Sequence, residues 1–264
     1  MLTSVANARV KQVVQWQTKA KERRKDKVFL AEGLRMCEEA PIDFIREVYL
    51  TVDMQEKAKQ NTVLWEKLEK AGYELVSDEV FSKMSDTQSP QGILTVLKQP
   101  SYTLEELLKK GGESPLFVIT ENLQDPGNLG TILRTGEGAG ITGLIMSKQT
   151  VDIFNPKTIR STMGSIFRVP FLYVEDLPQT MTILREAGVH TYAAHLKGKD
   201  YYQSETFDGP TAFLIGNEGN GLTKEIADMA EKYIKIPMEG QVESLNAAIA
   251  AALLMYEAHR QRHN

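Results

Sequence analysis

Residues 122–134 read Asn-Leu-Gln-Asp-Pro-Gly-Asn-Leu-Gly-Thr-Ile-Leu-Arg and follow closely on the apolar run 116–120. A buried strand, a turn rich in Pro, Gly and Asn, and then a helix is the arrangement in which parallel α/β sheets build ligand sites. We expect Asn128 to cap a helix over 129–138. Arg134 would then reach a group held at the helix N-terminus, where free backbone N–H groups bind phosphate. Taken singly, each residue also fits a plain structural role, a cap for Asn128 and a surface side chain for Arg134.

Two further segments share this chemistry. Residues 216–221 read Gly-Asn-Glu-Gly-Asn-Gly, and residues 236–246 read Ile-Pro-Met-Glu-Gly-Gln-Val-Glu-Ser-Leu-Asn. Glycines in the first let the backbone approach a ligand, and Glu218 would cap the next helix, bind a ribose or pair with Arg134. In the second, Ser244 is expected to cap the last helix, and Asn246 offers donors and acceptors to a substrate. Three such turns predict one composite pocket.

Strands and helices alternate in the second part of the chain. This pattern predicts a mainly parallel sheet covered on both faces. The expected strands span 116–120, 143–146, 170–174, 189–194, 212–215 and 233–236, and the expected helices span 129–138, 156–163, 177–187, 222–230 and 243–262. We expect three parts: a smaller α/β domain over 1–98, a linker over 99–112 and the larger α/β domain over 113–264.

The smaller domain is expected to begin with a basic helix over about 4–25 and to contain a second helix over about 54–70. Its strands are expected at 28–30, 45–50, 73–76 and 93–97, with a short helix at 34–40. In the linker, a helix over 104–110 ends at a glycine pair.

The composition excludes several classes of protein. The chain has 264 residues, of which 42% are hydrophobic and 25% charged, and its net charge of −4 is not that of a basic nucleic-acid binder. The single cysteine, Cys37, permits no intrachain disulfide and fits a reducing, cytoplasmic setting. No stretch approaches the roughly 18 apolar residues of a membrane span. The four histidines lack the spacing of metal ligands, so no metal is expected.

Positive charge is nevertheless concentrated in two places. Residues 1–27 hold eight Lys and Arg against two acidic residues, a local charge of +6, which can hold a phosphate backbone. A second stretch, residues 155–168, combines basic and small polar side chains that suit phosphate or sugar contacts. On spacing alone, each stretch is equally a solvated helix face. The candidate residues for binding a nucleic-acid backbone, which would be RNA on the resemblance given below, are Lys19, Arg23, Arg24, Lys157, Arg160 and Arg168.

The glycine-rich run 136–140 is similar to a nucleotide-binding loop, but it stands at the end of a helix. We therefore expect a helix C-terminus with a glycine in the left-handed conformation. A Rossmann oxidoreductase is disfavoured, because no Gly-x-Gly-x-x-Gly follows the first strand of the larger domain.

Taken together, the three segments resemble the signature motifs of the SpoU/TrmH-type RNA 2′-O-methyltransferases of the SPOUT class. The ordered triple is Asn-x-x-Asp-Pro-x-Asn-x-Gly-x-x-x-Arg, Gly-x-Glu-x-x-Gly, and Ile-Pro-Met followed by Ser-Leu-Asn. Residues 1–98 look like the ribosomal-protein-like RNA-binding domain of many members. One departure is Gly136, where many relatives have Ala, and it should loosen the helix slightly.

The resemblance implies a parallel-sheet α/β domain with a deep trefoil knot, which spacing alone does not show. It also implies S-adenosylmethionine as cofactor and a homodimer, for which the Ala-rich last helix is suited. The catalytic side would comprise Asn128, Arg134, Glu218, Ser244 and Asn246. The cofactor site would comprise Leu196, Gly216, Ile236, Met238 and Leu245.

The implied reaction is methyl transfer to a ribose 2′-OH, with RNA of the large ribosomal subunit as the expected substrate. A guanidinium stays protonated at any pH below its pKa of about 12. We therefore expect Arg134 to clamp a phosphate rather than to accept a proton, with Glu218 and Asn128 orienting it. The alternatives are a tRNA 2′-O-methyltransferase and a non-catalytic RNA-binding or ribosome-assembly protein on the same scaffold.

Overall fold

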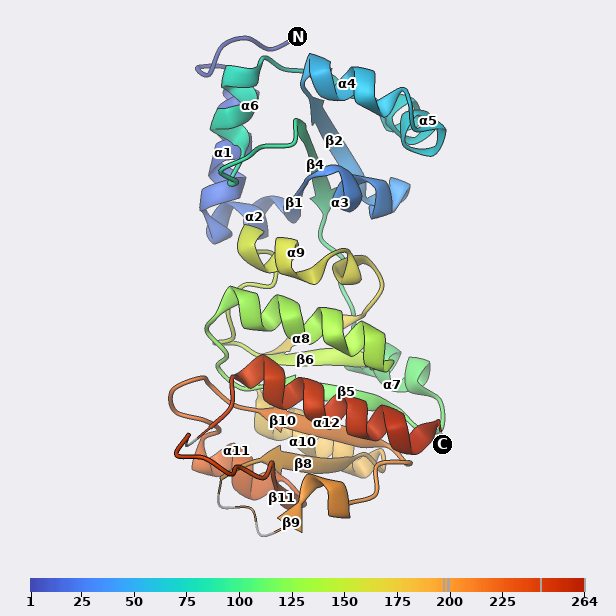
Figure 1. Cartoon of the computed structure of the whole chain (residues 1–264), viewed down its shortest axis with the longest axis vertical. Helices are drawn as coiled ribbons and strands as arrows, with labels where there is room; N and C mark the ends of the chain where they lie inside the picture. The colour runs from blue at the N-terminus through green and yellow to red at the C-terminus, as the bar shows by residue number, and fades with distance from the viewer. Residues whose placement is uncertain (197, 199, 243, 264) are drawn as a thin grey trace. The chain divides into compact units, whose positions relative to one another are not determined.

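The computed structural model describes residues 1–196, 198, 200–242 and 244–263. The chain forms two compact units, and Figure 1 shows the elements of both. Unit 1 comprises Met1–Pro100 together with Asp152–Phe167, and unit 2 comprises Ser101–Val151 together with Arg168–Asn264. No helix in the described part of the chain is long and apolar enough to cross a membrane.

Unit 1 is built on a mixed four-stranded sheet in the order β1-β4-β2-β3. The central strand β4 (Ile93–Lys98) pairs antiparallel with β1 (Val28–Glu32) and β2 (Ile45–Leu50), and β3 (Glu74–Leu75) pairs parallel with β2. The helices of this unit are α1 (Ala8–Thr18), α2 (Ala20–Asp26), α3 (Leu34–Glu39), α4 (Val52–Ala58), α5 (Thr62–Ala71), α6 (Asp78–Met84) and α9 (Pro156–Thr162).

The structure corrects two of the expected helices in unit 1. The basic helix expected over 4–25 is two helices, because Lys19 has an extended backbone between α1 and α2. The helix expected over 54–70 is also two, because Asn61 starts α5 anew by accepting from the backbone N–H of Leu64 over 3.1 Å. Local side chain-to-backbone bonds of this kind compete with a continuous helix. Helix α6 was not anticipated.

The segment Asp152–Phe167 belongs to unit 1 in the structure, although the sequence placed it in the larger domain. Arg23 Nη2 lies 2.6 Å from Asp152 Oδ2. The Phe29 ring lies 5.1 Å from that of Phe154 and 6.2 Å from that of Phe167. This placement could not be read from the sequence, because all three contacts join residues more than a hundred positions apart.

Unit 2 contains the predicted parallel sheet. Its seven strands are all parallel and lie in the order β7 (Phe171–Val174), β6 (Gly143–Ser147), β5 (Leu116–Thr120), β10 (Thr211–Ile215), β8 (His190–Ala194), β11 (Lys232–Lys235) and β9 (Asp200–Tyr201). The short edge strand β9 was not anticipated. The remaining strands match the expected ones to within one residue at each end, and β5, β6 and β10 are buried along their whole length.

Helices cover both faces of this sheet (Figure 1). On one face, α8 (Pro126–Ala139) packs against α12 (Ala247–Arg262). On the other, α7 (Leu104–Gly111), α10 (Leu177–Glu186) and α11 (Lys224–Met229) share one apolar core with the strands. As predicted, α8 ends at a left-handed glycine, Gly140. The start expected for the last helix, residue 243, lies outside the described residues.

The sheet has a point at which the strand order reverses. From β5 the chain passes through α8 to β6 on one side, while β10 lies on the other side of β5 and pairs with β8. At their carboxyl ends, Thr120 lies opposite Ile215. The loops that begin at Glu121 and Gly216 therefore start side by side, at the position where open α/β sheets bind ligands.

Candidate active site

Glu218 joins the loops that follow β5 and β10. Its Oε1 accepts from the backbone N–H of Asp125 over 2.9 Å and from Asn128 Nδ2 over 3.0 Å, and its Oε2 accepts from the backbone N–H of Gln124 over 3.0 Å. Three donors on one carboxylate fix both its position and that of the loop that precedes α8. The first and second predicted motifs therefore form one hydrogen-bonded unit.

The amide of Asn128 continues this network to the third motif. Because a carboxylate is an acceptor only, Asn128 must turn its NH₂ group to Glu218 and its oxygen away. That oxygen, Oδ1, accepts from Asn246 Nδ2 over 2.9 Å. We call the chain Glu218–Asn128–Asn246 the amide relay. Each amide keeps a second N–H beyond these bonds, which can donate to a substrate.

The carboxylate of Glu218 is held in its charged form. Burial alone would raise the pKa of Glu218, but the hydrogen bonds from Asn128, Gln124 and Asp125 outweigh it and lower the pKa below its ordinary value. A carboxylate whose oxygens already accept three N–H groups is a poor proton acceptor. Glu218 therefore orients Asn128 rather than acting as a base.

Two predicted helix caps are wrong, and the observed cap lies within three residues of the predicted one in each case. Asp125, not Asn128, caps α8 by accepting from the backbone N–H of Asn128 over 2.8 Å. Asn246, not Ser244, caps α12 by accepting from Ala248 over 2.9 Å. Pro126 occupies the first turn of α8, where its missing N–H costs nothing. The shift frees the side chain of Asn128 for the amide relay.

Gly216 has a different reason to be glycine than the one expected. A Cβ there would lie 2.1 Å from the carbonyl carbon of Gly221 and 2.2 Å from the nitrogen of Leu222. Asn217 and Gly221 exchange backbone hydrogen bonds of 3.0 and 2.9 Å, which close the loop. The close approach that requires glycine is thus made by the loop itself, and it sets where Glu218 projects.

Sequence reasoning assigned no role to two residues that brace the loops of the relay, Asn122 and Glu121. Asn122 has a left-handed backbone, with φ of 55°, and its carbonyl oxygen accepts from Asn217 Nδ2 over 2.9 Å. Glu121 is buried and accepts from the backbone N–H and the hydroxyl of Thr223, over 2.8 and 2.7 Å. The signal for Asn122 was its residue type, because Asn is, apart from Gly, among the residues that best tolerate the left-handed backbone conformation. Glu121 carried no comparable signal.

Arg134 does not pair with Glu218, contrary to the expected orientation. It lies on α8 with its side chain exposed. Within the part of the chain that the structure describes, no hydrogen bond or ion pair engages its guanidinium. Asn128 and Glu218 are satisfied by each other, so neither holds Arg134. The guanidinium is therefore available to a ligand.

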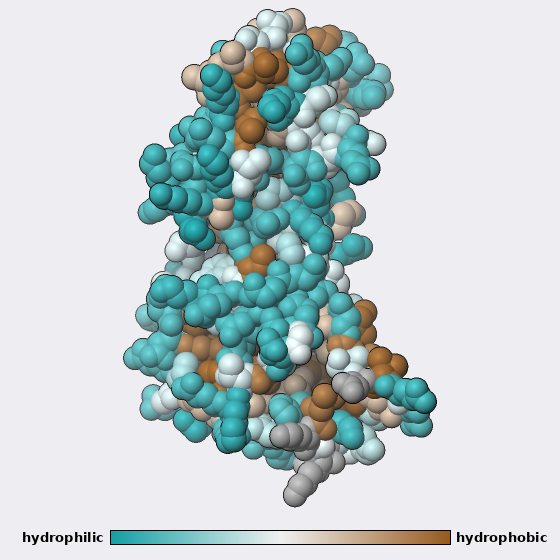
Figure 2. Space-filling view, turned by 90° about the vertical axis from the view of Figure 1, so that its left-hand side faces the viewer, coloured by the Kyte–Doolittle hydropathy of each residue, from teal (hydrophilic) through white to brown (hydrophobic). Residues whose placement is uncertain are grey.

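The predicted cofactor residues lie on three loops at the carboxyl edge of the sheet, after β8, β10 and β11. Ile236, Met238 and Leu245 are half-buried, and Leu196 is 59% exposed. Figure 2 shows hydrophobic side chains gathered on the lower part of one face, over the elements of unit 2. The described residues of 236–245 make no hydrogen bond to the rest of the chain. Their backbone N–H and C=O groups are thus available to a ligand.

The candidate RNA-binding residues differ in what they offer. Arg23 is 3% exposed and donates to the carbonyl oxygens of Trp16 and Gln17 as well as to Asp152, so it holds unit 1 together and presents no surface to RNA. Arg160 pairs with Asp86 over 2.7 Å in unit 1, and Arg168 pairs with Glu137 in unit 2. The exposed members are Lys19, Arg24, Lys157 and Arg168.

Comparisons with known proteins agree with this geometry. Residues 115–256 match the family model described as the SpoU rRNA Methylase family, and residues 7–95 match an MRM3-like substrate binding domain. The chain is 33% identical to the 23S rRNA (guanosine(2553)-2'-O)-methyltransferase RlmP of Bacillus subtilis, over 97% of each protein.

Two solved structures are similar over nearly the whole chain. One is an AdoMet-bound rRNA methyltransferase from Sinorhizobium meliloti, with a TM-score of 0.87 and 30% identity over 100% of this chain and 98% of that one. The other is the SpoU methyltransferase AviRb from Streptomyces viridochromogenes, with a TM-score of 0.84 and 26% identity over 97% and 98%. With both parts of the chain matched, the protein belongs to the SpoU rRNA methylase family of S-adenosylmethionine-dependent RNA 2′-O-methyltransferases.

Proposed function

We propose that this protein methylates a ribose 2′-OH in RNA of the large ribosomal subunit. The observation that carries the proposal is the amide relay at the strand-order reversal of the sheet, which brings all three motifs to one place. The relative from Bacillus subtilis is named for this reaction on 23S rRNA. The N-terminal match to a substrate binding domain supports a large, structured RNA as the substrate.

The residues of the carboxyl-edge loops fit S-adenosylmethionine. An adenine ring needs apolar side chains against its faces and backbone groups at its edge. The loop 236–245 offers both, through Ile236, Met238 and the unbonded backbone groups of its described residues. Leu196 and Leu245 would complete the apolar lining, with Gly216 at the end of β10. When bound, the cofactor supplies a methyl group activated on a sulfonium sulfur.

The protein's own part in the reaction is orientation and charge. Asn128 and Asn246, fixed by the relay, would donate their spare N–H groups to the ribose, while Ser244 lies exposed on the same loop. Arg134 would clamp the adjacent phosphate and stabilise negative charge that develops on the 2′-oxygen. Holding the reacting oxygen in line is worth several orders of magnitude in rate. No described residue of the relay is suited to accept the 2′-proton.

A second copy of this chain would complete the assembly as a homodimer. Helix α12 buries Ala251, Leu254 and Met255 against its own unit. Its opposite side still exposes Ile249, Leu253 and Tyr256, at 51%, 37% and 48%, spaced one helical turn apart. An apolar row on the outer side of a helix supports packing against a second partner. Leu253→Arg should convert the dimer to monomer in sedimentation, whereas Val63→Arg, on an exposed apolar residue of unit 1, should not.

The direct test of activity combines labelled S-adenosylmethionine with total RNA. Methylation at 2′-oxygen makes the next linkage resistant to alkali, so mapping resistant linkages gives both the activity and the nucleotide. Label in transfer RNA instead of large-subunit RNA would favour the tRNA alternative. Binding of RNA without binding of the cofactor would favour the non-catalytic alternative.

Several finer features belong to the same proposal. We expect the deep trefoil knot in unit 2 and a cytoplasmic location. Functionally, we expect residues 1–98 to bind RNA and residues 113–264 to carry out the chemistry, with Lys19, Arg24, Lys157 and Arg168 contacting RNA and Arg160 doing so on release from Asp86. Arg23 is withdrawn from this list, because its buried contacts leave nothing for RNA.

A further inference from the structure

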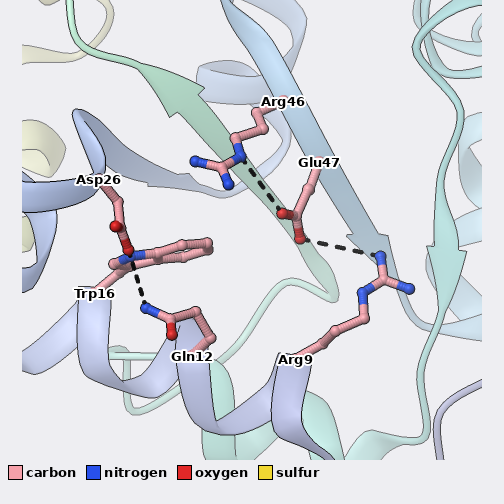
Figure 3. A pocket seen from close by; sticks show the side chains of 6 residues that line it. All are labelled: Arg9, Gln12, Trp16, Asp26, Arg46 and Glu47. Carbon is pink, nitrogen blue, oxygen red and sulfur yellow. Dashed lines mark hydrogen bonds and ion pairs between the residues drawn. The ribbon is translucent and has the colours of Figure 1, made fainter.

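Unit 1 contains a pocket that the proposed reaction does not use. Its volume is about 230 Å³, and it is lined by Arg9, Gln12, Trp16, Asp26, Arg46 and Glu47. These side chains come from α1, the end of α2 and the start of β2, and Figure 3 shows them turned toward one opening. The volume is below the roughly 300 Å³ at which sites for drug-sized ligands begin, so the pocket suits one small, flat group.

An irregularity in β2 creates this pocket. Ile45 lies opposite Leu97 and Glu47 lies opposite Val96, so Arg46 is an extra residue without a partner on β4. Side chains normally alternate between the two faces of a strand, and a bulge lets two successive side chains reach the same side. Bulges recur beside functional sites because they re-aim a side chain in this way. Here the bulge brings both Arg46 and Glu47 to the opening.

The guanidinium of Arg46 is held by a ring rather than by hydrogen bonds. Its Cζ lies 5.4 Å from the centre of the Trp16 ring, and Trp16 is itself fixed by donating to Asp26 over 2.7 Å. Arg46 Nε lies 3.8 Å from Glu47 Oε1, too far for a hydrogen bond. The side chain of Arg46 is 44% exposed. A flat cation is therefore held in place with its outer face and its N–H groups available.

Two carboxylates supply acceptors at the same opening. Asp26 Oδ2 accepts from Trp16 and Gln12, which leaves Oδ1 without a partner among the described residues. Glu47 accepts from the Tyr49 hydroxyl on Oε2, which leaves Oε1 with only the long ion pair. The two arginines of the lining face two carboxylates, and Arg9 also pairs with Glu74 over 3.0 Å, so the pocket has no excess positive charge and does not favour a phosphate. It favours a flat neutral group that carries both N–H donors and acceptors.

We propose that this pocket binds one unpaired guanine base of the RNA substrate, an inference that rests on the proposed function. Guanine presents two neighbouring N–H donors on one edge, which a carboxylate such as Glu47 accepts, and acceptors O6 and N7, which arginine reads. Unpaired bases in RNA are commonly recognised by stacking on arginine planes and by hydrogen bonds to their edges. Arg46 stacks on the base. Arg9 donates through Nη1 to Glu74 over 3.0 Å and lies 4.0 Å from Glu47 through Nη2, so its remaining N–H groups are those that reach the base acceptors.

The test uses full-length Trp65→Phe protein, in which Trp16 is the remaining one of two tryptophans. It is titrated with single-stranded oligouridine that carries one central G, A or C, and with oligouridine alone. The G-containing strand should quench Trp16 and bind about tenfold more tightly than the others, as expected for one well-read base. Equal binding of the four strands would overturn the proposal.

Variants assign the preference to the pocket. Arg46→Ala and Glu47→Gln should each abolish it, whereas Arg35→Ala and Glu56→Gln, which break exposed ion pairs elsewhere in unit 1, should retain it. An equal loss in Arg35→Ala would also overturn the proposal. Methyl transfer to ribosomal RNA is measured in parallel. A preserved guanine preference without transfer refutes only the proposed function, and transfer with an unchanged KM in Arg46→Ala refutes only the pocket.

Discussion

The two parts of the candidate active site are held in opposite ways. The relay side is fixed by hydrogen bonds from Glu218 to three donors and from Asn246 to Asn128. The cofactor side, residues 236–245, makes no such bond among its described residues. The first is organised before any ligand arrives, while the second has its polar groups left for the ligand to satisfy. In the proposed reaction, the groups that orient the ribose are therefore fixed by the protein itself, whereas the loop that binds the cofactor becomes ordered when the cofactor binds.

The largest expected effect is on the rate of methyl transfer, and it tests whether the relay side of the site carries the chemistry. Arg134→Ala should lower kcat by about 10²–10³-fold, as for loss of one charge-stabilising group. The free energy of unfolding should stay unchanged, because no described contact holds this side chain. Single-turnover methyl transfer and thermal unfolding measure the two. A pH–rate profile that loses an ionisation in this variant would instead make Arg134 the proton acceptor.

A pair of glycine variants contrasts the two sides directly. Gly216→Ala should destabilise the protein by about 1–3 kcal/mol and abolish activity, because a Cβ at 2.1 Å from backbone forces the Glu218 loop to move. Gly240→Ala should be tolerated, since among the described residues its Cβ would meet only Val242 Cγ2, at 3.8 Å. Chemical denaturation and cofactor titration compare the variants. Equal losses in both would mean that the two sides are equally rigid.

Breaking the amide relay should have an intermediate effect. Asn128→Ala removes the link between Glu218 and Asn246 and should lower kcat by about tenfold through lost orientation of the ribose. Cofactor affinity should change little, because no described residue of 236–245 is hydrogen-bonded to the relay. Hydrogen exchange adds a second readout: S-adenosylmethionine should protect amides of 236–245 and leave those of 124–128 as they were.

The smallest effect is the pH dependence of the fixed side. The lowered pKa of Glu218 means that its charged form stabilises the folded state, so the contribution is complete above its ordinary pKa of 4.5 and is lost as pH falls through the lower folded value. Glu218→Gln should cost about 1 kcal/mol at pH 7, a low figure for hydrogen bonds to a charge because the site is partly exposed. The difference in the free energy of unfolding between Glu218→Gln and the wild type should disappear as the pH falls below 4.5. A gap that instead widens on acidification would contradict this assignment.

Sequence reasoning reached the strands and the motif residues but not their pairing. The strand over 116–120 was predicted with its observed ends, because four successive apolar residues followed by a threonine can be read from the chain alone. That Glu218 binds Asn128 rather than Arg134 depends on Thr120 lying opposite Ile215, a register between strands almost a hundred residues apart. The predicted helix caps are two or three residues away from the observed ones. Asp, Asn and Ser are comparable caps, and the turn geometry decides between them.

The segment Asp152–Phe167 makes unit 1 a discontinuous domain, because it follows the first strands of unit 2 in the sequence. Phe154, Ile159 and Ile166 are buried within it, so its core stays open until the ribosome has released the chain beyond Phe167. During synthesis, the first unit therefore cannot close first, as N-terminal domains usually do. For the same reason, deleting residues 1–98 would strip the apolar cover from a segment of the remaining chain. A soluble catalytic fragment would need residues 152–167 replaced by a short polar bridge.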